Sequence, residues 1–307
     1  MDQYEKDLSS DAICNRKVYD VGAACNNQCY VIAVTVNMGF YDFFLNWYYF
    51  YEHSVLSHIF TSDEDVVHPL LVVIAEDYEV YNMLQTLTLN NTRILLGETS
   101  HVNGQAENYD SSGYKTLVSG RATHLLNLMC GLHSNQANMG LEFFPKWVVV
   151  YSDIDTVWLH DPLPVINNKL FDTTQNHESQ NHSLQYDILA AVDDHNFENF
   201  ETYYCTGFLV IADTSTSYIF LSQWEDELQK SPQLNQPIFN LLLHTSHPEY
   251  TLRHSGLDEV QFPSGRSFFD NDNKSQVLEQ TKVVHNNYII GKNSKKKRFE
   301  EYGIWKT

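Results

Sequence analysis

The sequence predicts an α/β fold in a single domain: one mostly parallel sheet with helices on both faces. Apolar, β-branched runs of strand length alternate along the chain with helical stretches, which is the pattern of strand–helix–strand units. The runs are near-continuous, as expected for strands buried on both faces. With 307 residues, of which 43% are hydrophobic, the chain is long enough to bury a sizeable core.

The elements follow from these runs in chain order. The predicted strands are 30–36, 70–75, 93–96, 147–151, 186–192 and 207–212. The predicted helices are 41–56, a stretch that opens at Glu76-Asp77, 114–132, 215–228 and 236–243. The second of these carries Val80, Met83, Leu84 and Leu87 on one face. Each helix has an apolar face, and turn residues such as those at 37–39 end the strands.

Polar segments without periodicity mark the parts outside this framework. Residues 1–29 predict an N-terminal tail or loose cover, so the domain proper spans 30–307. Segments 97–113 and 167–185 are long and polar, and loops of this kind often cover a site. We therefore expect one or both of them to act as a lid.

Charge excludes one class of function. Lys and Arg number 19 against 39 for Asp and Glu, giving −20 with His neutral, so the protein's own field opposes nucleic-acid binding. An acidic protein that handles an anionic metabolite needs a divalent metal or a local basic cluster. Five cysteines are too few, and odd in number, for a disulfide scaffold. Cys25 and Cys29 are either a local bridge or two reduced thiols.

No apolar run reaches the roughly 18–20 residues of a membrane helix, and the acidic, polar start of the chain is unlike a signal peptide. The expectation from these features is a soluble chain with no signal or membrane anchor, which leaves a cytoplasmic location open.

The sharpest chemical pattern is a buried strand that runs into Asp153 and Asp155. In an extended backbone the period of two puts both carboxylates on one side, roughly 7 Å apart at Cα. Hard oxygen ligands so placed suit Mg²⁺ or Mn²⁺ bound to a diphosphate. Two alternatives stay open: solvated or capping aspartates, and a haloacid-dehalogenase-like phosphohydrolase with Asp153 as nucleophile and Asp155 as acid. That phosphatase motif normally opens its domain, whereas half of this chain precedes it.

A second pattern lies near the C-terminus. His285 follows a β-branched pair and can be a third metal ligand, Gly291 lets the backbone approach phosphate, and Lys292 supplies positive charge. Taken alone, His285 is as well explained as a structural histidine. The basic run 295–298 is interpreted mainly as a solvated helix face.

Four stretches together resemble one family. They are SDIDTVWLHDPLP at 152–164, CTGFL at 205–209, NQPIFN at 235–240, and HNNYIIGK followed by RF and GIW within 285–305. They are similar, in the same order, to the SDxDxVWLxDP, NTGF, DQxxFN and HNNWxxGxxxKxxRFxxxGLW motifs of the nucleotide-diphospho-sugar transferases that include plant rhamnogalacturonan xylosyltransferases and extensin arabinosyltransferases. Cys205 stands where that family usually has Asn, and Asn235 where an acid is common.

The resemblance implies a GT-A-like (Rossmann-like) fold and a retaining, metal-dependent glycosyltransferase. Its donor would be a UDP-pentose (xylose or arabinose) or UDP-hexose, its acceptor a glycan or glycoprotein, and its location the Golgi or secretory lumen. Manganese, or magnesium, would lie on Asp153, Asp155 and His285. A catalytically inactive nucleotide-sugar-binding scaffold remains the third hypothesis.

The same resemblance implies roles for further residues. The nucleotide and diphosphate would contact Thr35, Asn37, Lys115, Arg121, Asp153, Gly207, Gly291 and Lys292. The transferred sugar would lie near Asp193, Asp194, Thr206 and Gln236. For Lys115 and Arg121 the alternative is a helix-surface charge, and for Asp193-Asp194 it is a helix cap or surface loop.

Overall fold

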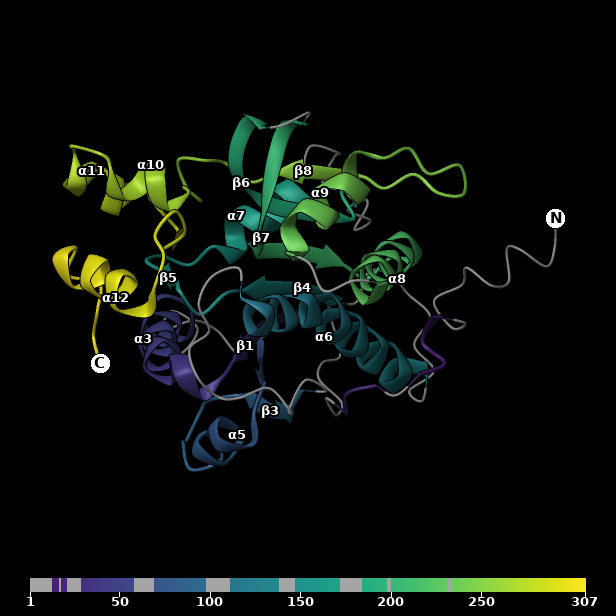
Figure 1. The fold of residues 1–307 in the computed structure, drawn as a ribbon, viewed down its shortest axis with the longest axis horizontal. Coiled ribbons are helices and arrows are strands. Elements are labelled where there is room, and N and C mark those ends of the chain that lie inside the picture. Colours follow the sequence, from purple (N-terminus) through teal and green to yellow (C-terminus); the bar gives the residue numbers. More distant parts are fainter. Residues whose placement is uncertain are drawn as a thin grey trace, which may run out of the picture.

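A seven-stranded sheet organises the protein (Figure 1). The computed structural model describes residues 13–16, 18–20, 29–57, 69–97, 111–137, 147–171, 184–197, 200–230 and 234–307. The strand order is β3 (Thr92–Leu96), β2 (Leu70–Ala75), β1 (Cys29–Val36), β4 (Trp147–Ser152), β7 (Phe200–Ala212), β6 (Ile188–Phe197) and β8 (His254–Gly256). Within it only β7 runs antiparallel to its neighbours. The predicted mostly parallel sheet is therefore confirmed.

Helices cover both faces of this sheet because successive residues of each strand point to opposite sides. On one side Ile32 and Val34 pack with α3 (Tyr41–Tyr51), α5 (Tyr78–Leu84) and α7 (Leu163–Leu170). On the other side Val31 and Ala33 pack with α6 (Ser112–Ala137), α8 (Ser215–Lys230) and α9 (Asn235–His244). The sheet thus separates two apolar cores, as predicted for strands buried on both faces.

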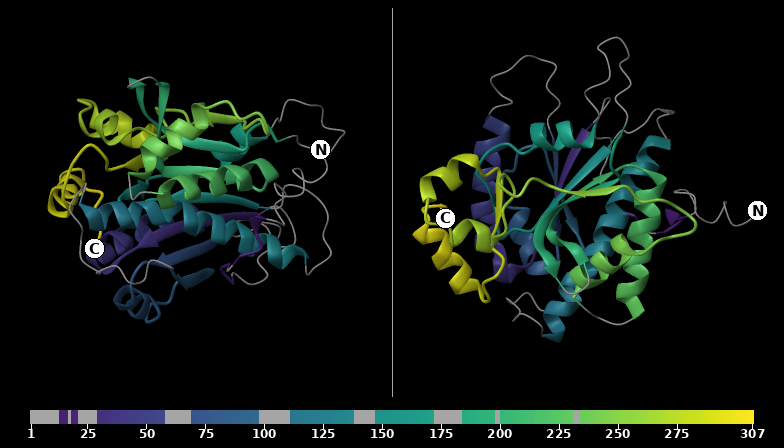
Figure 2. Two further views of the ribbon diagram at one scale, coloured as in Figure 1. Left: turned by 45° about the vertical axis from the view of Figure 1, so that its right-hand side comes forward. Right: turned by 90° about the horizontal axis from the view of Figure 1, so that it is seen from above.

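The C-terminal part forms a group of its own beside α3 (Figure 2). It contains α10 (Gly265–Phe269), α11 (Lys274–Gln280), β9 (Val283–His285) and α12 (Lys292–Glu301). β9 pairs antiparallel with β5 (Thr156–Trp158), which opposes His285 to Thr156. This short ribbon, rather than the main sheet, brings the C-terminus back to the Asp153–Asp155 segment.

Part of the predicted N-terminal tail is attached to the domain. A disulfide joins Cys14 to Cys130 on α6, and the Arg16 guanidinium forms an ion pair with Glu225 on α8. Tyr19 is buried, and its hydroxyl lies 2.8 Å from His124 Nδ1. Residues 13–16 and 18–20 are therefore a fixed cover over α6 and α8 rather than a loose tail. The side chains of Cys25 and Cys29 lie outside the described part of the chain.

Several boundaries differ from the predicted ones. The stretch 41–56 is one α-helix, α3, continued by the π-helical turn η2 (Glu52–Leu56). The two predicted lids lie mostly outside the described residues, and their described ends belong to α6 and α7. In the described ranges no helix has the length and apolar character needed to cross a membrane.

Candidate active site

The candidate site lies beyond the carboxyl ends of β1, β2 and β4, where open α/β sheets gather their ligands. Asp153 follows β4 directly, and its amide donates to Gly207 O on the neighbouring β7 (2.8 Å). Asp155 follows two residues later, just before β5. Asn286 N donates to Asp155 O (3.0 Å), which ties the segment after β9 to the same place.

Asp153, Asp155 and His285 form one cluster, as the sequence predicts. Each offers one ligand atom, and these atoms all lie within 4.8 Å of one another. His285 Nε2 is 3.2 Å from Asp155 Oδ1 and 3.8 Å from Asp153 Oδ2. Two carboxylates and an imidazole are a hard oxygen and nitrogen donor set that fits Mn²⁺ or Mg²⁺. The residues present therefore fit the metal that the sequence pattern implies.

Close packing against Gly207 fixes the shape of this cluster. A Cβ built on Gly207 would lie 2.3 Å from His285 Cε1 and 2.7 Å from Asp153 Oδ2. Real Cβ atoms do not approach other heavy atoms so closely, so only glycine at this place on β7 lets both ligands occupy their positions.

Cys205 orients the third ligand. Its buried sulfur lies 3.1 Å from His285 Nδ1, so the opposite ring nitrogen, Nε2, faces the two aspartates. Burial lowers the pKa of His285, but Cys205 and the Asp155 carboxylate outweigh it and hold this pKa well above its usual value. Such a partner on the outer nitrogen is the usual way in which proteins set the orientation of a ligating histidine.

Lys295, and not Lys292, is the lysine at the cluster. Its ammonium, on α12, forms an ion pair with Asp155 Oδ2. Burial raises the pKa of Asp155, yet Lys295 and His285 overcome this and hold that pKa below its usual value. Lys292 Nζ lies instead 2.8 Å from Asp42 Oδ1 on α3. The structure thus does not place Lys292 at the predicted diphosphate contact, and Lys295 is more than the solvated charge that the sequence suggested.

Arg121 is a site residue, because α6 points it at Asp153. Its guanidinium forms an ion pair with Asp153 Oδ1, donates to Thr206 O and Thr206 Oγ1 (both 2.9 Å), and lies over the Tyr151 ring. Burial lowers the pKa of Arg121, but Asp153 and Tyr151 more than compensate, so the pKa is raised. The alternative of a surface charge is wrong for Arg121. Lys115, which lies near the start of α6, is partly exposed.

A bulge sets the position of Asp193, the first of the two further carboxylates. Val192 pairs with Tyr204 and Asp194 with Tyr203, so Asp193 is an extra residue without a cross-strand partner. Bulges of this kind re-aim side chains at functional sites. The Asp193 carboxylate accepts from Gln236 Nε2 (2.8 Å) and Asn287 Nδ2 (2.5 Å).

Burial raises the pKa of Asp193, against the opposing effect of these two amide donors. Asp194 Oδ1 accepts from the amide of His195 (2.8 Å). Its carboxylate makes no other hydrogen bond among the residues that the structure describes. Gln236 and Asn287 therefore hold Asp193 in place, while Asp194 keeps an oxygen available for a substrate. The predicted Thr206 adjoins this group, and its amide donates to Gln236 Oε1 (3.4 Å).

The predicted nucleotide contacts Thr35 and Asn37 lie at the end of β1. Thr35 Oγ1 is 3.0 Å from the Tyr151 hydroxyl, which donates to Asp153 Oδ1 (2.8 Å). Asn37 is buried, and its side chain caps the short helix η1 (Met38–Phe40) by accepting from Phe40 N. Thr35 thus belongs to the hydrogen-bond network around Asp153. The Asn37 side chain stabilises the start of η1. Gly291, the N-cap of α12, has φ 91°.

Glu76 lies at the edge of the site, and the sequence analysis did not identify it as a site residue. It follows β2 directly, it is 8% exposed, and its side chain has no hydrogen-bond partner among the described residues. Burial raises the pKa of Glu76 to about 8; Arg121 opposes this rise, and the charges of nearby Asp153 and Asp77 add to it. Only its position at the end of a second parallel strand could have signalled it.

A Glu76→Gln variant should be more stable than the wild type at high pH and equally stable at low pH. Because the folded-state pKa lies above the unfolded one, ionisation of Glu76 costs stability progressively from about pH 4.5 to about pH 8. Melting temperatures in EDTA should differ by on the order of 5 °C at pH 9 and little at pH 4. The control is Glu79→Gln, on the exposed face of α5; equal shifts in both variants would contradict the assignment.

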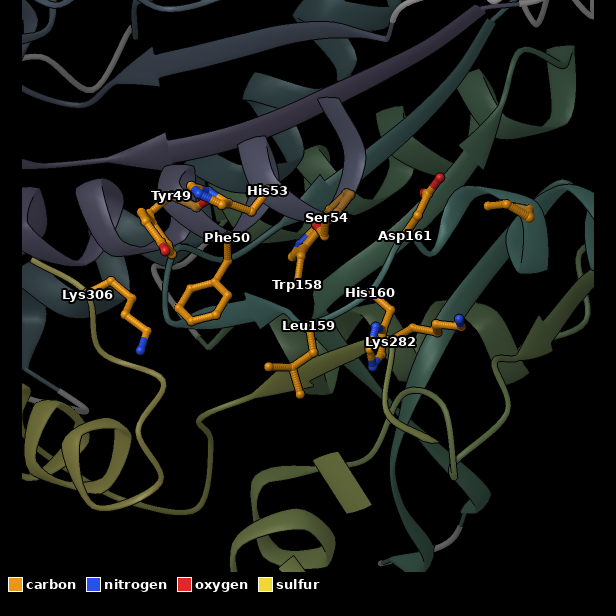
Figure 3. A pocket seen from close by; sticks show the side chains of 11 residues that line it. Tyr49, Phe50, His53, Ser54, Trp158, Leu159, His160, Asp161, Lys282 and Lys306 are labelled. Atoms are coloured by element: carbon orange, nitrogen blue, oxygen red, sulfur yellow. The ribbon is translucent and has the colours of Figure 1, made fainter. Parts of the chain in front are cut away.

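A separate surface cavity lies elsewhere (Figure 3). It measures about 500 Å³ and is lined by Tyr49, Phe50, His160 and Lys282 among others. Trp158, which also lines the cavity, opposes Val283 at one end of the β5–β9 ribbon, whereas His285 opposes Thr156 at the other end. The cavity is therefore separate from the cluster.

Comparisons with known proteins assign the chain to a protein family. The model of the nucleotide-diphospho-sugar transferase family matches residues 66–299, and the chain belongs to this family. The predicted GT-A-like fold also has support from a bifunctional glycosyltransferase, WbbM, whose solved structure is similar with a TM-score of 0.50 at 11% identity, over 94% of this chain and 52% of that one.

Among characterised relatives, UDP-D-xylose:L-fucose alpha-1,3-D-xylosyltransferase 1 of Arabidopsis thaliana is 30% identical over 216 residues, covering 65% of this chain and 53% of that protein. A UDP-galactose:fucoside alpha-3-galactosyltransferase of Dictyostelium discoideum is 28% identical over 172 residues, covering 51% of this chain and 25% of that protein. The chain thus spans about half the length of the plant relatives that it matches.

Proposed function

We propose that this protein transfers a sugar from a UDP-sugar to a hydroxyl of a glycan or glycoprotein, with retention and with a divalent metal, Mn²⁺ or Mg²⁺. The observation that carries the proposal is the Asp153–Asp155–His285 cluster at the carboxyl ends of the sheet. Family membership favours this reaction over the phosphohydrolase alternative, and in the structure Asp153 is held by Arg121 and Tyr151 rather than presented as a nucleophile.

In this proposal each part of the site has one task. A divalent ion on Asp153, Asp155 and His285 would neutralise charge on the departing UDP. Lys295 and Arg121 add positive charge beside the same two aspartates, where the leaving diphosphate gathers electrons. Gln236 and Asn287 hold Asp193 beside the sugar, and Asp194 offers an oxygen that can bind sugar hydroxyls or steady an oxocarbenium-like transition state.

The relatives support both the donor and the stereochemistry. Several of those found are named for transfer of D-xylose from UDP-D-xylose in an alpha-1,3 linkage to L-fucose. UDP-xylose itself carries its sugar in the α configuration, so an α product corresponds to retention. We therefore favour a pentose donor, and the relatives' named fucose and fucoside substrates make a fucosylated glycan the first acceptor to test.

The Cys14–Cys130 disulfide supports a location in the secretory lumen. Disulfides form and persist in oxidising compartments and are rare in the cytosol. The Golgi is the member of that pathway that the proposed glycan acceptor favours.

Calorimetric titration of UDP tests the proposal and the lysine assignment together. We expect micromolar binding with Mn²⁺ and none in EDTA. Lys295→Met should weaken UDP binding about tenfold or more, because an ammonium beside a diphosphate is lost. Lys296→Met is the matched control, since this lysine lies over Trp305 and near Asp42 (4.0 Å) and not at Asp155.

Three results would count against these assignments. Equal binding with and without metal would remove the metal from the mechanism. No binding in either condition would count against both the transferase and the nucleotide-sugar-binding scaffold, and would leave the phosphohydrolase. Loss of binding in Lys292→Met but not in Lys295→Met would restore the lysine assignment made from the sequence.

A further inference from the structure

An exposed aromatic ring lies next to the proposed sugar subsite. Tyr288, in the loop between β9 and α12, is 42% exposed. Its φ is 57°, a left-handed backbone conformation that is uncommon for a bulky residue and that must be held by its surroundings.

Two contacts fix the ring in place. The Tyr288 hydroxyl donates to Asp193 O (2.9 Å), and the Arg266 guanidinium lies over the ring, 4.3 Å from its centroid. The loop itself is anchored by Asn287, whose Oδ1 accepts from Gly265 N (2.6 Å). Arg266 covers one face of the ring, and the exposed surface of Tyr288 is accordingly a rigid, preorganised plane.

This plane belongs to the sugar side of the site. Its hydroxyl binds the backbone of Asp193, whose carboxylate is held by Gln236 and Asn287. Burial is the main cause of the raised pKa of Tyr288, and the charges of Asp193 and Asp194 add to it, which shows how near they are. The ring thus borders the carboxylate that keeps an oxygen available for a substrate.

We propose that Tyr288 is the platform on which the acceptor saccharide lies, with a neutral pyranose placing its apolar C–H face on the exposed ring. The inference rests on the proposed transferase function. Aromatic planes of this kind hold sugars by burying C–H groups while leaving hydroxyls at the edge. A sugar on Tyr288 would direct an edge hydroxyl toward Asp194 and the donor. Arg266 acts here as a positioning residue, since it holds the ring.

Steady-state kinetics with separate donor and acceptor readouts tests the platform. Methyl glycosides of fucose, galactose and xylose serve as acceptors for UDP-xylose, and hydrolysis of UDP-xylose without acceptor reports the donor site. Tyr288→Leu should raise the acceptor KM about tenfold above that of Tyr288→Phe, while the two variants hydrolyse UDP-xylose at the same rate, because both lose the hydroxyl contact with Asp193 O. Tyr288→Phe keeps the ring and should restore most of the acceptor affinity. The matched control is Tyr49→Leu, an exposed tyrosine on α3 that is 36% exposed and lines the separate cavity.

Each other outcome has a definite meaning. A Tyr288→Leu enzyme with the same acceptor KM as Tyr288→Phe, or with hydrolysis reduced below that of Tyr288→Phe, overturns the platform while leaving the transferase intact. A wild type that hydrolyses UDP-xylose but glycosylates none of the three neutral sugars overturns the neutral-saccharide assignment. A wild type that does not bind UDP with metal shows that the proposed function itself has failed.

Discussion

A Gly207→Ala variant should fold but lose metal-dependent donor binding. The added methyl would lie 2.3 Å from His285 Cε1 and 2.7 Å from Asp153 Oδ2, so both ligands must move, by about 1 Å or more, to reach ordinary contact distances. Displacements of this size cost roughly 100-fold in reactions that depend on position. We expect UDP titrations with Mn²⁺ to show at least that loss.

Gly256→Ala is the matched control for this experiment. Its Cβ would meet Val192 Cγ2 at 2.6 Å, in the pairing of β8 with β6 and away from the cluster. It should lower the melting temperature without abolishing metal-dependent UDP binding. Wild-type metal affinity in Gly207→Ala would show that the cluster does not depend on close packing against β7.

An Asp155→Asn variant should lose transfer by about 100-fold to 1,000-fold, the usual scale for removing one group that stabilises transition-state charge. Asn keeps the shape of the side chain but removes the negative charge that faces His285 and Lys295. The metal would lose a charged ligand, and the Lys295 ammonium would lose its partner. Transfer of xylose from UDP-xylose, measured over a range of Mn²⁺ concentrations, should show the loss even at saturating metal.

Asp42→Asn removes a comparable ion pair elsewhere, the one with Lys292. It should leave transfer within about threefold of the wild type, as expected for a surface pair. If instead Asp155→Asn kept full Mn²⁺-dependent activity while Asp42→Asn lost it, the metal and the diphosphate would have to be assigned to the other pair.

The parallel half of the sheet could be predicted because each of its strands is a short, continuous apolar run. The predicted strand 70–75 is β2 to the residue, and β1 and β4 differ from their predictions by one residue each. The antiparallel direction of β7 could not be predicted. A strand buried on both faces shows no periodicity that distinguishes the two directions.

The metal cluster was predictable because Asp-x-Asp and His285 carry chemistry in their residue types. The sequence analysis singled out Lys292, although one turn of helix decides which of several lysines in 292–297 faces the cluster. α12 presents Lys295 to Asp155 and Lys292 to Asp42. The spacing Gly-x-x-x-Lys in the family pattern already distinguishes them, since it leads from Gly291 to Lys295. Glu76 depends on burial, which no local pattern records, whereas Tyr288 stands where the family pattern has Trp and depends in addition on the geometry of its loop.

The Cys14–Cys130 disulfide closes a covalent ring around β1, β2 and β3, with a sequence separation of 116 residues. Thr35, Glu76 and Arg121 lie inside this ring, and Asp153 and His285 lie outside it, so the site is assembled across its boundary. When force is applied to the two ends of the chain, the disulfide prevents the residues between Cys14 and Cys130 from being stretched. This removes roughly 400 Å of contour length from the extension, at about 3.5 Å per residue. An oxidised molecule would therefore extend by its C-terminal half alone, and would part the Arg121–Asp153 ion pair without stretching the strands of the ring.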